Sequence, residues 1–144
     1  MNLDLLIEHV KDAEDSAHKE GERFFPYTDT TGHTTIGWGH NLEEGIDEDV
    51  AEHQLRNDIN NSIADCRTFD YWFSLDSVRQ LVVCDLVFNL GLPKWRTFVK
   101  ANEALLDGDY EEAAKQLEDS RWYWQTKRRA RKLVKAMRTG LWDS

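Results

Sequence analysis

The sequence predicts an α+β fold, mostly α, in which a small lobe with a β-sheet is joined by a long helix to a helical lobe. An amphipathic helical pattern opens the chain, a stretch rich in aromatic residues, Thr and Gly follows it, and helical patterns fill the remainder. The 144 residues have the length of one ordinary domain. We therefore expect a single domain over residues 1–144, with a small lobe at about 1–45, a connecting helix at about 47–66 and a helical lobe at about 67–144. A cleft between the lobes is the natural place for a ligand.

The first element is an amphipathic helix predicted over residues 3–20. Its apolar side chains recur at steps of three and four residues: Leu3, Leu6, Val10, Ala13 and Ala17. Gly21 follows as a stop signal. From Arg23 to Asn41 the composition shifts to aromatic residues, Thr and Gly, with a turn signal in the middle. This pattern predicts a small β-meander.

The helical part begins with the connecting helix, for which Asp47 is a suitable N-cap. Ser74 is the predicted cap of the next helix, which is apolar on nearly every side and is therefore expected in the middle of the core. Asp85 interrupts this helix and is expected to be a buried polar group with a partner. Three further helices are predicted at about 95–106, 110–118 and 127–138. Asp109 with Glu112 forms a capping-box pattern for the second of them, and Gly140 follows the last.

Charge is distributed unevenly along the chain, whose formal net charge is −9. Residues 1–70 carry 17 acidic and 5 basic side chains, whereas residues 119–144 carry 8 basic and 2 acidic ones. The acidic majority disfavours generic nucleic-acid binding, although the basic C-terminal segment could contact an anionic polymer. A solvated helix face is the commoner explanation of such a segment.

The sequence contains no apolar run long enough for a transmembrane helix, and its first residues lack the pattern of a secretory signal. We therefore expect the chain to stay in the cytoplasm unless something else releases it. Cys66 and Cys84 lack the spacing of metal ligands and are expected to be reduced rather than paired. No cofactor and no metal are expected.

Two carboxylates stand out near the predicted sheet. Glu20 lies at the predicted end of the first helix, and Asp29 ends the first strand of the meander. Cleavage of a glycosidic bond needs two acids, because one must donate a proton to the leaving oxygen while the other stays ionised. Each residue alone is a weak signal, since a Glu at a helix end is usually solvated and an Asp before Thr-Thr-Gly is usually an ordinary turn residue.

The combination of residues resembles the phage lysozyme family, the muramidases of T-even phage type. The motifs that carry the resemblance occur in the same order as in that family: Glu20-Gly21, Tyr27, Asp29, Gly32, Thr35-Ile36-Gly37-Trp38-Gly39-His40, Ser74-Leu75-Asp76, Phe88-Asn89-Leu90-Gly91, Ser120-Arg121-Trp122-Tyr123 and Arg138-Thr139-Gly140. Together they cover most of the chain. The resemblance implies a lysozyme-like two-lobe fold with a three-stranded sheet in the small lobe.

The resemblance also implies roles for individual residues. Glu20 is expected to be the general acid, Asp29 to position or activate a water molecule, and Thr35 to help hold that water. The family inverts the anomeric centre, so the two carboxyl groups are expected to stand roughly 6.5–9.5 Å apart. Substrate contacts are implied for Asn41, Phe88, Asn89 and Gln116, and supporting roles for His40, Asp58, Arg121 and Arg129. In the family pattern His40 pairs with Asp58, and an arginine at the position of Arg129 approaches the acid.

The sequence departs from the family pattern in several places. Thr31 stands where an acidic residue reaches across the cleft, and Ala101 stands at the position of a cleft serine. The segment between the sheet and the connecting helix, at residues 43–45, is shorter, and the first helix begins nearly three turns earlier. The acidic net charge is also unusual, since lysozymes of this kind are commonly basic. If electrostatic attraction guides the protein to the wall, the basic cluster at residues 121–138 is the surface expected to provide that attraction.

The function implied is that of an endolysin that cuts the β-1,4 bond between N-acetylmuramic acid and N-acetylglucosamine in peptidoglycan, for host lysis. Such a protein is expected to be a monomer that waits in the host cytoplasm and reaches the periplasm or cell wall after a holin opens the membrane. Neither nucleic-acid binding nor stable membrane association is expected. Three alternatives stay open: a catalytically inactive wall-binding or inhibitor-like module on the same fold, a helical protein that binds nucleic acid through residues 127–138, and a lytic transglycosylase.

Overall fold

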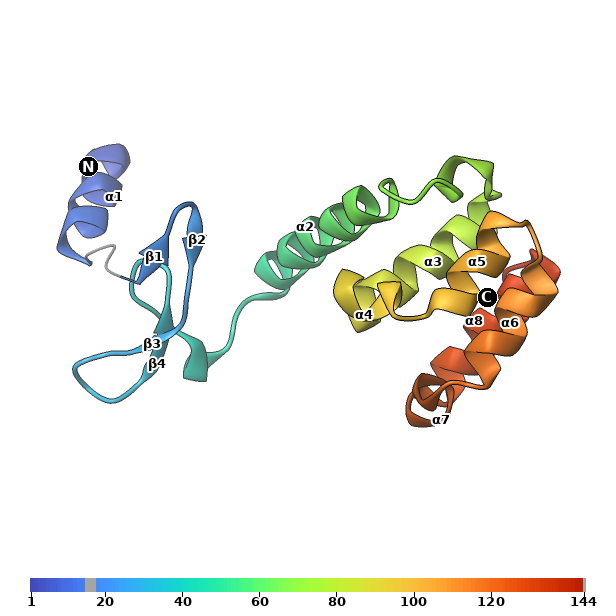
Figure 1. Ribbon diagram of the computed structural model, residues 1–144. Helices are drawn as coiled ribbons and strands as arrows, with labels where there is room; N and C mark the ends of the chain where they lie inside the picture. Colours follow the sequence, from blue (N-terminus) through green and yellow to red (C-terminus); the bar gives the residue numbers. More distant parts are fainter. Residues whose placement is uncertain (15–17, 144) are drawn as a thin grey trace. The chain divides into compact units, whose positions relative to one another are not determined.

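The structure is a computed structural model that describes residues 1–14 and 18–143 (Figure 1). The chain falls into two compact units, Met1–Glu52 and His53–Ser144. All strands of the described residues lie in the first unit, and the second unit is helical. This distribution confirms the predicted α+β fold, in which helices predominate.

Helix α1 (Leu3–Ala13) opens the first unit. The Oδ1 atom of Asn2 caps it by accepting a hydrogen bond from the Leu5 N–H at 3.1 Å. Its last helical bond runs from the Glu14 N–H to the Val10 carbonyl at 2.9 Å. The prediction of a helix as far as residue 20 is therefore wrong. The prediction extended the helix beyond Ala13 on the strength of one apolar residue, Ala17, which lies outside the described residues.

A short hairpin replaces the predicted end of this helix. Strand β1 (Lys19–Glu20) pairs antiparallel with β2 (Arg23–Phe24), with Glu20 opposite Arg23. Gly21 makes the tight turn possible because its φ of 59° lies in the left-handed region that favours glycine. Glu20 thus belongs to a strand and not to a helix end, because its backbone pairs with Arg23 across the hairpin and not with residues of a helix.

The predicted three-stranded sheet is present. It consists of β3 (Tyr27–Thr28), β4 (Thr34–Ile36) and β5 (His40–Asn41), all antiparallel, in the order β3-β4-β5. A short 3₁₀ helix, η1 (Leu42–Glu44), follows β5. On the central strand, Thr35 lies opposite Tyr27 on one side and Asn41 on the other. Among the described residues of the first unit, Thr35 is the only one that is buried, with 2% of its surface exposed.

The long helix α2 (Glu48–Cys66) begins one residue after Asp47, as the sequence predicted. A 3₁₀ turn, η2 (Trp72–Ser74), separates it from α3 (Ser77–Leu90). The cap of α3 is Asp76, whose Oδ1 atom accepts a hydrogen bond from the Arg79 N–H at 3.0 Å. The prediction that Ser74 caps α3 is wrong, because Ser74 belongs to the preceding turn.

The C-terminal helices follow the local signals with two exceptions. The predicted helix at residues 95–106 is interrupted after Arg96, and α7 was not predicted at all. The Asp109 carboxylate caps the helix at residues 110–118 by accepting from the Glu112 N–H at 3.0 Å, and Gly140 ends α8 in the left-handed conformation. The second half of the predicted capping box is absent, because the Asp109 N–H donates to the Ala104 carbonyl and the Glu112 carboxylate accepts from Gln116. The observed elements are α4 (Leu92–Arg96), α5 (Val99–Leu106), α6 (Tyr110–Glu118), α7 (Arg121–Thr126) and α8 (Arg128–Thr139).

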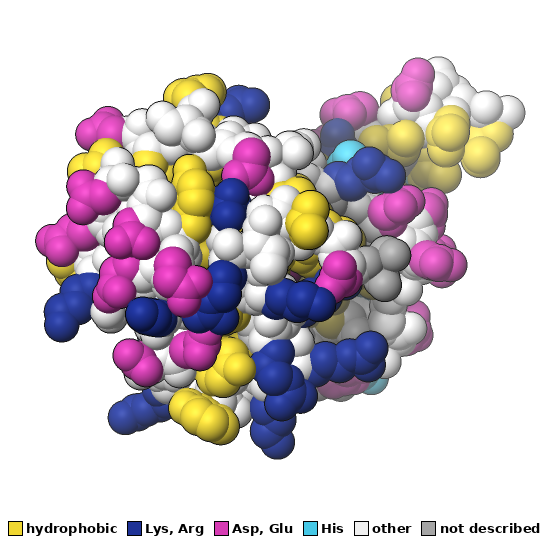
Figure 2. Space-filling view, turned by 90° about the vertical axis from the view of Figure 1, so that its right-hand side faces the viewer, with side chains coloured by type: hydrophobic (Ala, Val, Ile, Leu, Met, Phe, Trp, Pro, Cys, Tyr) yellow, Lys and Arg dark blue, Asp and Glu magenta, His cyan; other side chains and the backbone are white. Residues whose placement is uncertain are grey.

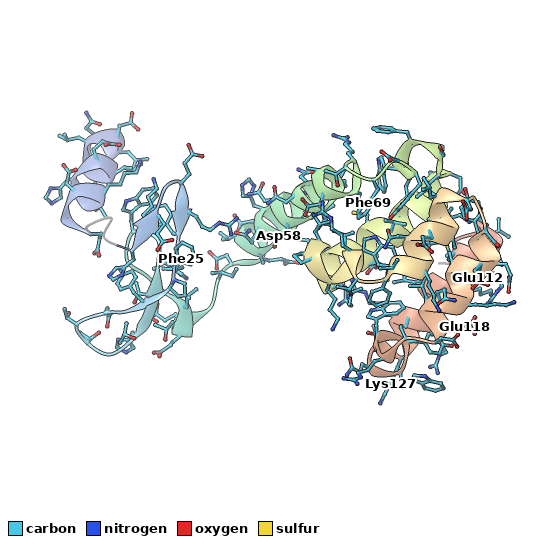
Figure 3. All side chains as sticks on the ribbon, in the orientation of Figure 1. Phe25, Asp58, Phe69, Glu112, Glu118 and Lys127 are labelled. Carbon is cyan, nitrogen blue, oxygen red and sulfur yellow. The ribbon has the colours of Figure 1, made fainter. Side chains whose placement is uncertain are left out.

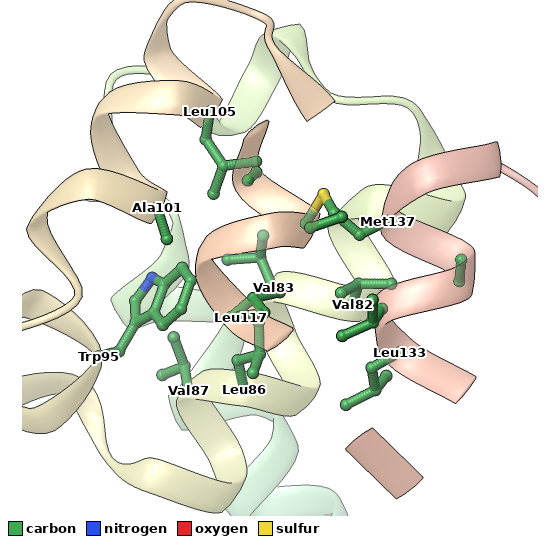
Figure 4. Close-up of a cluster of buried hydrophobic side chains, with 14 of the residues drawn as sticks. Val82, Val83, Leu86, Val87, Trp95, Ala101, Leu105, Leu117, Leu133 and Met137 are labelled. Carbon is green, nitrogen blue, oxygen red and sulfur yellow. The ribbon is translucent and has the colours of Figure 1, made fainter. Parts of the chain in front are cut away.

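The hydrophobic core of the second unit is built around α3, as expected for a helix that is apolar on most sides. Figure 4 shows the α3 side chains packed among side chains from the later helices. The largest fully buried side chains of the described chain are Trp95, Leu86, Leu117, Leu133, Met137, Val82, Val83 and Cys66. Leu81 and Phe88 lie on the side of α3 that faces away from this core, where 42% and 38% of their surfaces are exposed.

Candidate functional site

The loop after β3 is built around one oxygen atom of Asp29. The Oδ1 atom accepts hydrogen bonds from the Thr31 N–H at 2.9 Å, the Thr31 hydroxyl at 2.8 Å and the His33 N–H at 2.8 Å. The backbone closes the same loop, because the Asp29 N–H donates to the His33 carbonyl at 2.9 Å and the Gly32 N–H donates to the Asp29 carbonyl at 3.1 Å. The position and orientation of the Asp29 carboxylate are therefore fixed by its own loop.

These hydrogen bonds also set the charge of Asp29. The backbone N–H of His33 and, after it, the hydroxyl of Thr31 lower the pKa of Asp29 below its ordinary value, because they stabilise the ionised carboxylate. Asp29 is thus held in its charged form at neutral pH. That is the state required of a group that accepts a proton from water.

Thr31 connects Asp29 to His33. The carboxylate can only accept, so the Thr31 hydroxyl donates to Asp29 and must itself accept from His33, whose Nδ1 atom lies 2.7 Å away. This arrangement places the proton on Nδ1 of His33. The other ring nitrogen lies 3.9 Å from a carboxylate oxygen of Glu43. The sequence showed Thr31 only as a departure from the family pattern, whereas the structure makes Thr31 and His33 partners of the candidate base.

Replacing Thr31 by Val is expected to raise the pKa of Asp29 towards its ordinary value, because Val keeps the volume but removes the hydroxyl donor. A carboxyl with a lowered pKa contributes stability above its unfolded pKa and loses it as the pH falls through the folded pKa. Thr31→Val should therefore be less stable than the wild type at neutral pH, and this difference should shrink in acid. A ¹³C NMR titration of the Asp29 carboxyl and unfolding curves at several pH values measure both effects. Thr30→Val is the matched control, and equal Asp29 pKa values in both variants would contradict the assignment.

Glu20 and Thr35 lie in the same unit as Asp29. Glu20 is exposed on β1, one residue before the hairpin turn. Thr35 is buried on β4, and its hydroxyl donates to the His33 carbonyl at 3.0 Å. Thr35 and Asp29 therefore both bind the backbone of His33, from the strand and from the loop. The separation of the two carboxyl groups and the role of Thr35 in holding water stay predictions.

The predicted supporting residues His40 and Asp58 each have a hydrogen-bond partner in their own unit. The Nε2 atom of His40 donates to the Gly45 carbonyl at 2.8 Å. Asp58, labelled on α2 in Figure 3, accepts from the Gln54 side chain at 3.1 Å. Their pairing with each other stays a prediction. Asn41, a predicted sugar contact, caps η1 by accepting from the Glu43 N–H at 2.9 Å.

The predicted contact residues of the second unit, and the predicted supporting residues Arg121 and Arg129, lie along different hollows of its surface. Phe88 and Arg129 line a pocket of about 750 Å³ whose walls are mainly apolar. Asn89 and Arg121 share a hollow of about 380 Å³, in which Asn89 accepts a hydrogen bond from the Trp122 indole at 2.9 Å. Gln116 lines a third hollow of about 440 Å³ and donates to Glu112 at 2.8 Å. The structure thus brings together only two pairs of these residues.

Arg129 is paired with Asp85. Its Nε and Nη2 atoms donate to one carboxylate oxygen of Asp85, at 2.9 and 2.5 Å. This ion pair confirms that Asp85 has a polar partner, as expected for a charge within an apolar helix. The prediction that Asp85 is buried is wrong, because 24% of its side chain is exposed. The ion pair engages the guanidinium group of Arg129, which in the family pattern approaches the general acid. The approach of Arg129 to Glu20 stays a prediction.

The cysteines form no disulfide in the structure. Cys66 is buried, and a hydrogen bond with Cys84 raises the pKa of the Cys66 thiol and lowers that of Cys84. Within the described residues, no three His, Cys, Asp or Glu side chains are grouped so that they could hold a metal ion. Among the same residues, no helix combines the length and the apolar character needed to span a bilayer.

Comparison with known proteins gives matches over nearly the whole chain. The family model described as phage lysozyme matches residues 17–139. Probable T4-type lysozyme 1 of Dictyostelium discoideum is 25% identical, and the alignment covers 94% of this chain and 96% of that protein. Probable T4-type lysozyme 2 of the same organism is 26% identical, over 85% of this chain and 91% of its own length. The pre-baseplate central spike protein Gp5 of Enterobacteria phage T4 is 28% identical over 87% of this chain, which corresponds to 27% of Gp5.

Proposed function

Because the chain belongs to the phage lysozyme family, it is a glycoside hydrolase that acts on peptidoglycan, and we propose that it hydrolyses the β-1,4 bond between N-acetylmuramic acid and N-acetylglucosamine with inversion. The observation that carries this proposal is the Asp29 carboxylate, which three hydrogen bonds to one oxygen hold in the ionised state. An inverting glycosidase needs one carboxylate of this kind and one protonated acid.

In the proposed reaction, Glu20 donates its proton to the glycosidic oxygen as the bond to the anomeric carbon breaks. A water molecule attacks that carbon from the opposite face, and Asp29 accepts the proton that the water loses. All three hydrogen bonds that the structure gives to the Asp29 carboxylate go to Oδ1. This leaves Oδ2 to accept from the attacking water, while the loop keeps the carboxylate in place.

The products of digestion test this proposal. Purified peptidoglycan is digested and the new chain ends are identified by reduction with borohydride and mass spectrometry. A new reducing N-acetylmuramic acid is the expected result. The anomer is observed by ¹H NMR on unreduced product, and formation of the α anomer first would establish inversion. A 1,6-anhydro end would assign the protein to the lytic transglycosylases instead, and a reducing N-acetylglucosamine would show that the other bond is cut. The absence of any new end would favour an inactive wall-binding module.

We propose that the biological role is host lysis, with a holin as the partner that gives access to the wall. The support is the match to the phage lysozyme family. Cells that express the protein without a holin should stay intact until their membrane is permeabilised with chloroform. Lysis without permeabilisation would show that the protein reaches the wall by another route.

A further inference from the structure

Exposed basic and aromatic side chains lie at the end of α7, along α8 and just after α8. We call this surface the α8 patch, and its members are Trp124, Lys127, Arg128, Arg131, Lys132 and Trp142. All six are exposed, and 72% of the Trp124 surface is open to solvent. Figure 2 shows Lys and Arg side chains gathered over the lower part of the helical unit, and Figure 3 labels Lys127 at the α7 end. Lys132 lies over the Trp142 ring, 4.3 Å from its centre.

Three cations of the α8 patch, Lys127, Arg128 and Arg131, differ in their partners from Lys135 and Arg138 of α8. Lys135 binds Asp143, and Arg138 binds both Glu111 and Glu118. In the part of the chain that the structure describes, no acidic side chain lies within ion-pair distance of Lys127, Arg128 or Arg131. The positive charge of this surface is therefore available to a ligand.

This arrangement lowers the stability of the helix that carries it. A helix N-terminus bears a partial positive charge, so acidic residues stabilise the first turn and cations destabilise it. Lys127 is the N-cap residue of α8, Arg128 begins its first turn, and that turn has no acidic residue. Lys127 also has a φ of 56°, a conformation that favours glycine. A purely structural role therefore does not explain why this surface is basic.

The partner that fits this surface is an anionic polysaccharide. Guanidinium groups bind carboxylates well, and exposed indole faces pack against the C–H faces of sugar rings. A membrane fits less well, because the apolar side of α8 is buried in the core through Leu133, Val134 and Met137 and is not free to enter a bilayer. A protein with a net charge of −9 also needs a local positive surface to approach an anionic polymer.

We propose that the α8 patch is a second binding site for peptidoglycan, carried by the helical unit in addition to the proposed catalytic residues Glu20 and Asp29 of the first unit, in which Arg128 and Arg131 pair with carboxylates of the stem peptides and Trp124 packs against the glycan. The identity of this ligand rests on the proposed function. The patch would hold the enzyme on its insoluble substrate between cleavage events.

Co-sedimentation with purified peptidoglycan sacculi that contain no teichoic acid tests this proposal. The double variant Arg128→Glu/Arg131→Glu should bind about tenfold more weakly than the wild type at low salt, and its binding should depend less on salt. Arg96→Glu/Lys100→Glu is the matched control, because it makes the same change of charge at two exposed cations outside the patch. The Arg128→Glu change places an acid in the first turn of α8, so an unchanged or raised melting temperature should accompany the weaker binding.

Two further arms identify the ligand and separate this proposal from the proposed function. Amidation of the stem-peptide carboxylates should weaken wild-type binding until the wild type and the double variant bind the sacculi equally. Short soluble glycan fragments without stem peptides should be hydrolysed at the same rate by both proteins. Equal binding of the double variant and its control would overturn the proposal. It would also be overturned if the wild type bound amidated sacculi as tightly as untreated sacculi, or bound phosphatidylglycerol vesicles more tightly than sacculi. If the wild type does not hydrolyse peptidoglycan, the proposed function fails, but the sedimentation result still stands.

Discussion

Replacing Glu20 by Gln is expected to lower the rate of peptidoglycan hydrolysis by roughly 100- to 10,000-fold, which is the usual contribution of general acid catalysis. Gln has nearly the same shape as Glu but no proton to donate to the leaving oxygen. The side chain is exposed, and the pairing of β1 with Arg23 on β2 is a backbone interaction, so the hairpin should not depend on the carboxyl group. The initial rate of release of new reducing ends from sacculi measures the effect.

Glu22→Gln is the control for this variant. Glu22 is exposed in the turn of the same hairpin, two residues from Glu20, and loses the same charge. Its rate should stay within about twofold of the wild type, as expected for a surface residue outside the reaction. If Glu20→Gln kept the wild-type rate, Glu20 would not be the acid, although the wild-type products would still show whether the protein is a muramidase.

Replacing Asp29 by Asn is expected to lower the rate by roughly 100-fold or more, because an amide cannot accept a proton from the attacking water. The carbonyl oxygen of Asn can still accept the hydrogen bonds from Thr31 and His33 that organise the loop. The loss should therefore appear in kcat, with a KM close to that of the wild type and an unchanged circular dichroism spectrum. Kinetics on soluble glycan fragments give the two constants separately.

The control for Asp29→Asn is Asp12→Asn, which removes the same charge from an exposed position at the end of α1. It should retain the wild-type kcat, which would show that the charge matters only at Asp29. A wild-type kcat in Asp29→Asn would contradict the role of base and would leave water activation to another group.

Much of the fold could be predicted because its signals are local. The helix over Tyr110–Glu118 starts at an Asp109 whose side chain bonds to the backbone three residues later, and such a contact needs no distant partner. The end of α8 at Gly140 is local for the same reason. The cap of α3 was misplaced because Ser74 and Asp76 are both good caps, and only the path of the preceding 3₁₀ turn decides between them.

The candidate site could be predicted only in part. Glu20 and Asp29 were proposed from the spacing of motifs and from the family resemblance, and their catalytic roles stay predictions. The hairpin around Glu20 was missed, because a two-residue strand gives almost no periodicity. The part played by Thr31 and His33 was missed as well, although the spacing Asp-x-Thr-x-His is typical of side chains that bond to nearby backbone.

By itself the sequence determined the mixed helical and sheet architecture, the separation of acidic and basic segments, and the residue types available for catalysis, since these follow from composition and from periodicity along the chain. Only the tertiary structure decided which side chains became partners. Arg129 binds Asp85, 44 positions away, and Arg79 donates from α3 to the Met137 carbonyl at 2.7 Å, 58 positions away. Such pairs depend on how the packed core brings distant backbone segments together, and a local pattern cannot record that.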